Sequence, residues 1–532
     1  MPSAMTGGRD SSVATSSTRQ GEPTPAANAS ASRLLKNFVA NYLSFAAAVL
    51  LSVVLTPVVL HHAGVVVYGL WVALSAVGAY VGLLDAGVST AAVREVAAAI
   101  ALGDDDRLNS ILDTVNVFFV LTGLLACLVT LAIVPFVGDF VKLPPGTLEA
   151  ARVALVIKGA TTTVGFVRMI PSVGLYGSGR ADINAYLGAA LVTLTQGSQI
   201  AVTLLGGGLI GLFATSLGCQ ALALAASWVM ARRLQVGRRF RLHVKVSVLR
   251  ELVSQGWQNT LLSISGIVSY ALDALVLAVL LPISQLAAYD IALSTANLAG
   301  NLSTTGTSLL VPTYAHSNAV DDAARQFKLF TRAVLASSSI ALAVSAALVA
   351  YGQELMSLWL GKVPAHTYEI LVVMNLVFLV RMPGRQAAVY LAGIGKVRLI
   401  SRMALSFAVI NLGLTVGATM WLGVIGPVVG SVPQVVIFEF AVLPKLCCRE
   451  LGVSFRSYAK AAIAPLGATF LAAVTASLTL KAWLPDSTLW APVGSVVIVL
   501  VSVSALVVYL WSHDLEVKVI LTRYARRVAQ RG

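Results

Sequence analysis

The sequence predicts an all-α polytopic membrane protein of about fourteen transmembrane helices, with two six-helix lobes in parallel repeat and two further C-terminal helices. Three observations predict this fold class. The composition is too apolar for a water-soluble chain, fourteen long apolar runs follow one another, and the first six runs resemble the next six at a spacing near 215 residues.

The composition shows which solvent the chain needs. Of the 532 residues, 57% are hydrophobic and 11% are charged, and the mean hydropathy is +0.84. Soluble domains are about 45–50% apolar and about 25% charged. One water-soluble core cannot bury this surplus, so lipid must cover much of the surface.

Each membrane-spanning helix needs roughly 20 mostly apolar residues. The runs are long and do not alternate between apolar and polar residues, which favours helices over barrel strands. The predicted spans are 37–61, 65–93, 111–137, 150–175, 183–205, 208–231, 252–281, 286–314, 330–352, 367–392, 400–422, 425–444, 460–483 and 490–511.

The basic residues predict the orientation, because cytoplasmic loops collect Lys and Arg. With both termini in the cytoplasm, 32 of the 37 Lys and Arg residues lie on the cytoplasmic side. The other five are Lys142, Arg152, Lys158, Lys362 and Lys481. The net charge of +14 is therefore explained by orientation in the plasma (inner) membrane, and nucleic acid is not an expected partner.

The domain boundaries follow from these spans. A polar tail rich in Ser, Thr, Ala, Gly and Pro is expected to be disordered in the cytoplasm, and without an apolar run it is not a cleaved signal peptide. The basic linker fits either a surface helix on anionic lipid or a plain cytoplasmic connection. The expected segments are the tail 1–36, the N-lobe 37–231, the linker 232–251, the C-lobe 252–444, the two last helices 445–511 and a basic cytoplasmic tail 512–532.

Four short matches in chain order define the repeat. They pair Arg168-Met-Ile-Pro171 with Arg381-Met-Pro383, Gly177-Ser-Gly-Arg180 with Gly393-Ile-Gly-Lys396, Gly208-Leu-Ile-Gly211 with Gly423-Val-Ile-Gly426, and Asn41 with Asn259. Six helices separate the copies, so the copies have the same orientation in the membrane. Two such lobes are expected to enclose a cavity near the membrane midplane, as in many transporters.

The sequence contains no motif that is typical of an enzyme. It contains no Gly-Lys-Ser/Thr phosphate loop, no Gly-x-Ser-x-Gly and no His-Glu-x-x-His. The four cysteines lie in or beside apolar runs, which implies neither a disulfide framework nor a zinc site. We expect a protein that is not an enzyme and needs neither a cofactor nor a metal.

Polar stripes at helical spacing predict which residues line the cavity. One stripe on 150–175 contains Lys158 and Arg168, one on 252–281 contains Asn259, Tyr270 and Asp273, and a milder one on 37–61 contains Asn41. Lys158, Arg168 and Arg381 would supply positive charge for an anionic headgroup. The alternative is that small and polar residues only allow close helix packing, with the arginines snorkelling to the surface.

Embedded acids are the candidates for ion coupling. Asp273 and Asp290 lie on either side of the short turn at Pro282, so we expect them at similar depth on neighbouring helices. A proton or sodium ion could bind there. Asp85 is a third candidate. The alternative is that each acid pairs with a cation or caps a helix.

Several motifs resemble those of a known family. The segment from Gly64-Val-Val-Val-Tyr68-Gly-Leu-Trp71 through Leu83-Leu-Asp85-Ala-Gly87 to Arg94-Glu95 resembles the amino-terminal signature of polysaccharide repeat-unit flippases. These are the Wzx-like branch of the MATE-like (MOP) exporter superfamily. Asp273 followed by Tyr289-Asp-Ile-Ala resembles the corresponding part of the second lobe, and the similarity covers residues 35–512.

The resemblance implies a flippase that moves undecaprenyl-diphosphate-linked oligosaccharides from the inner to the outer leaflet by alternating access. It implies membrane lipids, a polysaccharide polymerase and glycosyltransferases as partners. Two alternatives remain open, namely a cation-coupled multidrug or metabolite antiporter of the same superfamily and a lipid II flippase. The sequence departs from the most familiar layout in its long N-terminal tail and in lacking a strongly charged first helix.

Overall fold

The computed structural model describes residues 49–234, 244–270, 272–304, 310–319, 322–483 and 490–513, which form helices and turns with no strand among them. The predicted all-α class is therefore confirmed. Within these residues, ten helical segments are long and apolar enough to cross a membrane. Nine overlap one predicted span each, and Val397–Glu450 contains two. The total of fourteen stays a prediction, because the spans predicted at 37–61, 252–281 and 286–314 coincide with none of the ten.

The N-lobe is built around α6, which packs against α4 on one side and α8 on the other. Its first helix is described over Val49–His62. The elements that follow are α2 (Gly64–Val81), η1 (Gly82–Asp85), α3 (Val88–Leu102), α4 (Asp105–Ile133), η2 (Val134–Phe136), α5 (Val137–Phe140), α6 (Leu148–Gly177), α7 (Ala181–Leu204) and α8 (Gly208–Arg233).

The C-lobe is built in the same way around α14, which packs against α13 and against the π-helix η5. Its elements are α9 (Val246–Tyr270), α10 (Leu272–Leu280), α11 (Ile283–Thr304), α12 (Leu310–Ala319), α13 (Ala323–Leu360), α14 (Thr367–Gly393), α15 (Val397–Leu422), η4 (Gly423–Ile425), α16 (Gly426–Gln434), η5 (Val435–Val442) and α17 (Leu443–Glu450). After α18 (Phe455–Tyr458) and η6 (Ala459–Ile463), the last two helices, α19 (Leu466–Trp483) and α20 (Ala491–His513), pack on α13.

The repeated Gly-x-Gly-Arg/Lys motif forms the same turn in both lobes. The helices α6 and α14 end at Gly177 and Gly393, and each contains one internal proline. Gly179 and Gly395 follow with φ angles of +76° and +80°, a left-handed conformation that glycine adopts at little cost. In both turns the next amide, of Arg180 or Lys396, donates back to a helix carbonyl at 2.9 Å.

The run predicted as one span at 65–93 is broken in the structure. The helix stops at Val81 and passes through η1 to Ala86 and Gly87, whose φ angles are +49° and +69°. A side chain on Gly87 would overlap the backbone carbonyl of Gly256 in α9. The break therefore turns the chain and lets α3 pack closely on α9. The boundary predicted between residues 251 and 252 falls inside α9.

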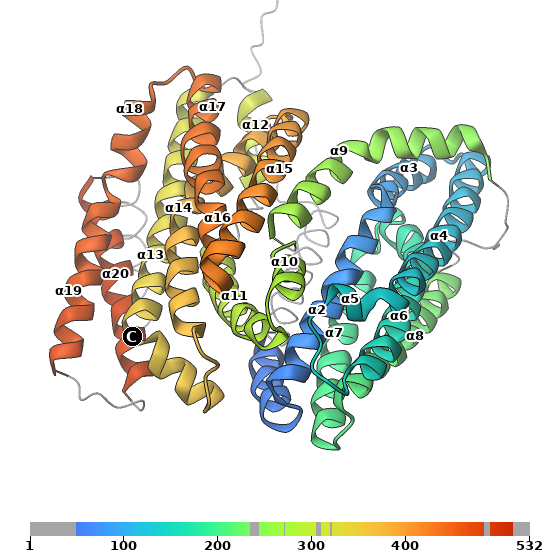
Figure 1. Ribbon diagram of the computed structural model, residues 1–532. Coiled ribbons are helices and arrows are strands. Elements are labelled where there is room, and N and C mark those ends of the chain that lie inside the picture. The colour runs from blue at the N-terminus through green and yellow to red at the C-terminus, as the bar shows by residue number, and fades with distance from the viewer. Residues whose placement is uncertain are drawn as a thin grey trace, which may run out of the picture.

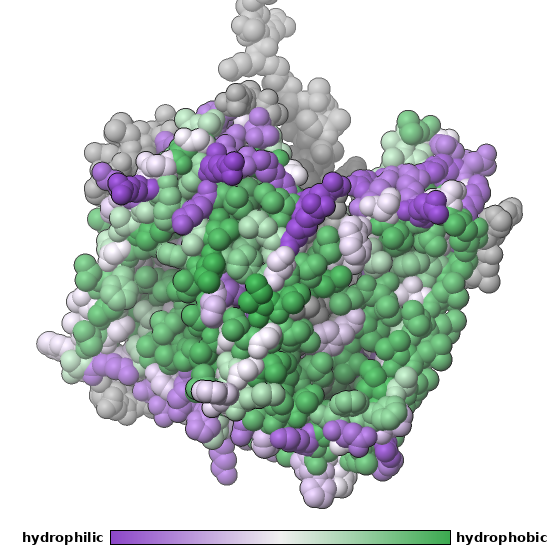
Figure 2. All heavy atoms as spheres, turned by 45° about the horizontal axis from the view of Figure 1, so that its top comes forward, coloured by the Kyte–Doolittle hydropathy of each residue, from purple (hydrophilic) through white to green (hydrophobic). Residues whose placement is uncertain are grey.

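The two lobes lie side by side and meet at one end (Figure 1). We call the end that carries Arg94, Arg107 and Lys245 the basic end, and the other the opposite end. Toward the opposite end α2 packs on α10 and α11, whereas toward the basic end the lobes diverge and α9 crosses from one to the other (Figure 1). A broad apolar belt separates two polar rims on the face shown in Figure 2. With the ten apolar segments, this belt identifies a multi-pass membrane protein.

Candidate functional site

A polar cavity lies inside the C-lobe, beside its central helix α14. Its volume is about 260 Å³. Polar side chains from four helices converge on it, although most of the surrounding lobe is apolar. The lining residues are Asp273 from α10, Tyr289, Leu293 and Asn297 from α11, Met374, Val377, Phe378, Arg381 and Arg385 from α14, and Val428 and Ser431 from α16.

Arg381 forms a buried ion pair at the wall of this cavity. Its Nε lies 3.2 Å from Oε2 of Glu439, and the two side chains are only 5% and 8% exposed. The guanidinium also lies over the Phe378 ring, 5.3 Å from its centroid. Much of the Arg381 charge is therefore balanced within the protein, since a buried cation is costly unless it is paired.

Local backbone features bring Glu439 to this position. Glu439 lies in the π-helix η5, whose wider turn changes the direction of the side chains that follow. A side chain on Gly384 of α14 would overlap backbone and Cβ atoms of Glu439. Only glycine at this position allows α14 and η5 to approach closely enough for the ion pair.

Two aspartates of the C-lobe each accept a hydrogen bond from a tyrosine. The Tyr289 hydroxyl donates to Asp273 at 2.6 Å, within the lobe. The Tyr68 hydroxyl, on α2 of the N-lobe, donates to Asp290 at 2.7 Å. Because Tyr289 and Asp290 are consecutive on α11, the two pairs are linked through one helix, and the second pair joins the lobes.

The lobes make further contacts toward the opposite end. The Lys142 ammonium donates to the carbonyl of Leu280 at 2.6 Å, and the Trp359 indole donates to the carbonyl of Val53 at 2.6 Å. Gly69 of α2 packs against the backbone of Ile283 at the start of α11. One apolar cluster includes buried residues of both lobes, among them Leu70 and Leu286. The lobes are therefore closely packed in this region.

The N-lobe cations predicted for a cavity do not line the C-lobe cavity. Lys158 extends over Gly78 of α2, where a larger side chain would overlap the lysine ammonium end. Arg168 is half-buried on α6, and its Nε is buried without a hydrogen-bond partner among the described residues. The structure thus places Lys158 and Arg168 on α6 of the N-lobe, away from the cavity that Arg381 lines.

The remaining candidates fall into two groups. Asp85 accepts hydrogen bonds from the amide and the hydroxyl of Ser89, at 3.1 and 2.7 Å, and so caps the start of α3. Asn41 lies outside the described residues, as do the side chains of Asn259 and Tyr270 on α9.

Sequence reasoning missed Arg385 as a cavity residue. The orientation analysis counted it among the cytoplasmic basic residues, whereas the structure places it at the wall of the cavity. The missed signal is its spacing, because Arg385 follows Arg381 by one helical turn on the same face. Asn297 and Ser431, which also line the cavity, carry no signal of their own in the sequence.

Comparisons with known proteins identify the family and the fold. The model of a family described as polysaccharide biosynthesis protein matches residues 67–363. No curated protein matches the sequence significantly. Among solved structures, the lipid II flippase MurJ in an inward closed conformation is 12% identical with a TM-score of 0.71, over 90% of this chain and 99% of that one.

Two MATE transporters have the same fold. An inward-facing MATE family transporter of the MOP superfamily is 15% identical with a TM-score of 0.63, over 75% of this chain and 99% of its own. A point mutant of the Vibrio cholerae MATE transporter VcmN is 12% identical with a TM-score of 0.55, over 80% and 98%. These identities show the fold alone, whereas the family model covers more than half of the sequence. The chain therefore has the fold of MOP transporters and belongs to the polysaccharide biosynthesis protein family.

Proposed function

We propose that this protein is a flippase that moves undecaprenyl-diphosphate-linked oligosaccharide repeat units from the inner to the outer leaflet of the plasma membrane by alternating access. The observation that carries the proposal is the arrangement of the lobes in a chain of the polysaccharide biosynthesis family. They pack closely toward one end, through α2, α10 and α11, and their ribbons diverge toward the other (Figure 1), as two lobes that alternate between packed arrangements would. The activity is transport, and the protein is not an enzyme.

The positive-inside rule assigns the basic end and both termini to the cytoplasm. The lobes then diverge toward the leaflet in which the cargo starts. For the cargo to leave, the contacts between α2 and α11 must break and the lobes must close at the basic end. Interfaces of this kind switch between two packed arrangements.

The C-lobe cavity suits the charged part of the cargo. No described acid forms an ion pair with Arg385, in contrast to Arg381, and a guanidinium binds phosphate oxygens through two parallel hydrogen bonds. Asn297 and Ser431 add neutral hydrogen-bonding groups. A cavity of about 260 Å³ fits a diphosphate or one sugar, so the rest of a repeat unit would occupy the space between the lobes. Lys158 and Arg168 do not line this cavity, and they stay proposed substrate-binding residues of the N-lobe.

An apolar groove on the other side of α14 suits the lipid tail. It lies between α13, α14 and α19, has a volume of about 320 Å³, and is lined almost entirely by apolar side chains with Lys481 among them. Leu376 and Leu379 line this groove, whereas Phe378 and Arg381 of the same helix line the polar cavity. A polyprenyl chain bound here would remain in an apolar environment.

The two tyrosine–aspartate pairs are the proposed coupling sites. Asp290 is the stronger candidate, because its hydrogen bond from Tyr68 joins the lobes. A proton or cation that competes with Tyr68 for this carboxylate would favour separation of the lobes. Asp273 has its hydrogen bond within one lobe and would act through the cavity.

The first test measures the lipid-linked sugars in cells that lack the protein. We expect one complete repeat unit on its polyprenyl carrier to accumulate on the cytoplasmic side, detected by lipid extraction and mass spectrometry. An unchanged pool, in cells that make the glycan and have no second flippase, would refute the proposal. Accumulation of lipid II instead would identify a lipid II flippase.

A second test addresses the cavity. Arg385→Gln is expected to slow translocation of the lipid-linked unit in proteoliposomes, because the variant loses the bidentate phosphate contact. Arg398→Gln is the matched control, since Arg398 is exposed on α15. Equal rates for both variants would remove Arg385 from the site.

The antiporter is the second candidate, favoured by the buried carboxylates of Asp273 and Asp290. Efflux of an organic cation driven by a proton or sodium gradient, with an unchanged lipid-linked pool in the deletion strain, would support it. The polymerase and glycosyltransferases remain proposed partners, and their capture with the intact protein from membranes would test them.

A further inference from the structure

The first half of α9 has two faces of opposite character. Toward the N-lobe, Val248 and Leu252 are buried to 4% and 1% exposure in an apolar cluster with residues of α3 and α4. On the outer face, Val246, Val253 and Trp257 are 70%, 36% and 53% exposed. These side chains follow one stripe of the helix, together with Leu249, Arg250 and Ser254, and line a shallow groove along it.

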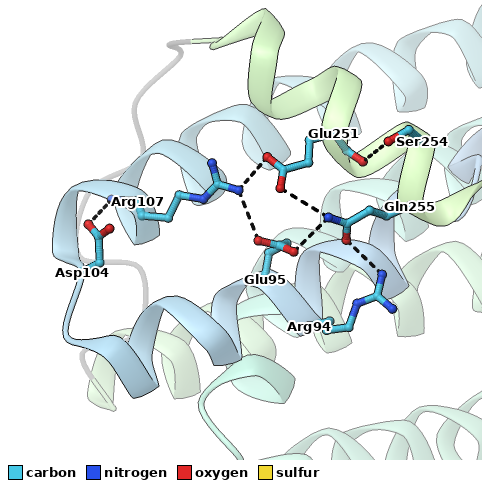
Figure 3. A network of polar contacts seen from close by, with 7 residues as sticks. All are labelled: Arg94, Glu95, Asp104, Arg107, Glu251, Ser254 and Gln255. Atoms are coloured by element: carbon cyan, nitrogen blue, oxygen red, sulfur yellow. Dashed lines mark hydrogen bonds and ion pairs between the residues drawn. The ribbon is translucent and has the colours of Figure 1, made fainter.

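A polar network fixes which face points outward (Figure 3). Arg107 of α4 contacts Glu251 at 2.6 Å and Glu95 of α3 at 3.2 Å. Gln255 donates to Glu95 at 3.0 Å and accepts from Arg94 at 2.9 Å. If α9 rolled to hide its outer stripe, Glu251 and Gln255 would leave all these partners. The apolar stripe is therefore held outward.

Two further contacts hold the same side of α9. The Lys245 ammonium donates to the Ser110 hydroxyl at 2.6 Å, just before the helix begins. Further along the helix, Gly256 packs directly on the backbone of Gly87. The inner face of the first half of α9 is thus attached to the N-lobe from Lys245 to Gly256.

The position of the stripe indicates which part of the membrane surrounds it. The first half of α9 lies along the basic end of the N-lobe, and the helix then descends between the lobes (Figure 1). Polar side chains form the rim at that end, directly above the apolar belt (Figure 2). In membrane proteins this level is the headgroup region, where tryptophan is enriched and basic side chains meet lipid phosphates.

We propose that the outer stripe of α9, from Val246 to Trp257, is an interfacial surface that binds anionic lipid of the leaflet at the basic end. Apolar side chains on one face with a basic residue among them are typical of helices that lie in the interface plane. The stripe includes Arg250 but no acid, and Glu251 points to Arg107 on the inner face. Arg250 would contact lipid phosphates, while Trp257 and Val253 would insert beside the acyl chains.

This surface would link the lipid to the lobe movement. The first half of α9 is attached to the N-lobe, whereas α15 of the C-lobe also packs on α9. A leaflet that holds the stripe therefore holds a helix that contacts both lobes. The inference does not depend on the cargo, because it concerns the position of a helix in lipid.

The experiment places an environment-sensitive NBD label at single cysteines in the full chain, with the four native cysteines replaced. The labelled positions are Val253→Cys and Trp257→Cys, and the matched control is Asp105→Cys, an exposed residue at the same end. The proteins are placed in nanodiscs of phosphatidylglycerol or of phosphatidylcholine. No cargo is present, so the result is separate from any flippase assay.

We expect labels at positions 253 and 257 to emit at shorter wavelength than the label at 105. Lipids brominated near the headgroup end of the acyl chains should quench them, whereas aqueous iodide should quench only the label at 105. Arg250→Gln, in the Val253→Cys protein, should reduce bromolipid quenching in phosphatidylglycerol but not in phosphatidylcholine. This variant retains Trp257 and the inner network, so it is a milder change than Trp257→Cys.

Two outcomes would overturn the proposal. Iodide quenching at 253 and 257 as strong as at 105 would place the stripe in water. A short-wavelength emission without bromolipid quenching would show that protein, and not lipid, covers the stripe.

Discussion

Gly69 is the position at which a single added methyl group tests alternating access. A Cβ on Gly69 would overlap the carbonyl oxygen of Ile283 and lie 3.2 Å from its carbonyl carbon and 3.3 Å from its Cγ1. The obstacle is backbone at the start of α11, so it cannot move aside as a flexible side chain would. Gly69→Ala should therefore push α2 away from α11 where the lobes meet.

The expected size follows from the cost of overpacking. Extra atoms in a close-packed region cost about 1–3 kcal/mol, and a difference of this size changes an equilibrium constant about 5- to 150-fold. The gain in helix propensity from Gly to Ala applies to both states and cancels. Gly69→Ala should shift the population by this factor toward the state that is open at the opposite end.

Labelling from outside the cell measures this shift. A cysteine at Ala287, buried where the lobes meet, should react with an impermeant maleimide faster in the Gly69→Ala protein than in the parent. Gly188→Ala is the control, because nothing lies within 4 Å of the added Cβ. An unchanged labelling rate in a folded Gly69→Ala protein would refute the reasoning that these contacts must break.

Three further predictions follow from the ion pairs and hydrogen bonds. Tyr68→Phe removes the 2.7 Å hydrogen bond to Asp290 and leaves a buried acceptor, so the closed contact should weaken by about 1–3 kcal/mol; distance measurements between spin labels on the two lobes would report it. Glu439→Ala leaves Arg381 buried without its 3.2 Å partner and should cost about 3–5 kcal/mol of stability. Thermal unfolding in detergent should show this loss, and replacement of both residues by methionine should restore most of it. The pKa of Glu95 lies below its usual value, chiefly because Gln255 donates a hydrogen bond to its carboxylate and to a lesser extent because Arg107 does. The stabilisation that Glu95 gives to α9 is therefore fully present above the ordinary carboxyl pKa of about 4.3. It is lost as the pH falls through the lowered pKa. Hydrogen exchange of α9, corrected for intrinsic rates, should rise at that acidic limit in the parent and already be faster at neutral pH in Glu95→Gln.

Apolar length and repeated motifs predicted most of the fold. Eleven of the fourteen predicted spans overlap the ten apolar segments, because lipid exposure requires continuous apolar runs. The Gly-x-Gly turns were found for a similar reason, since the left-handed backbone at Gly179 and Gly395 restricts the residue type. The break at Ala86 was missed, because nothing local distinguishes alanine in a left-handed turn from alanine in a helix.

The site was less predictable than the fold. Asp273 and Arg381 were identified by their cost in a membrane, and they line the same cavity. The pairing of Arg381 with Glu439 depends on a π-helix and on the absence of a side chain at Gly384. Such a contact between distant segments has no periodic signal. The network around Arg107 was missed for the same reason, because it joins residues of three helices, α3, α4 and α9.

The π-helix that carries Glu439 makes the two lobes unequal. At the repeat offset of 215, the position of Glu439 corresponds to Leu224 in α8, which is described as a regular α-helix. Both lobes keep the arginine before the proline, yet Arg381 has an internal counter-ion and Arg168 has no ion pair with a described residue. The two lobes therefore differ in charge at equivalent positions. The arginine of the C-lobe is neutralised by an acid, and the arginine of the N-lobe is not neutralised by any described acid. An anion that enters between the lobes would be attracted more strongly by the N-lobe arginine than by the C-lobe arginine. The two halves of the transport cycle therefore need not mirror each other.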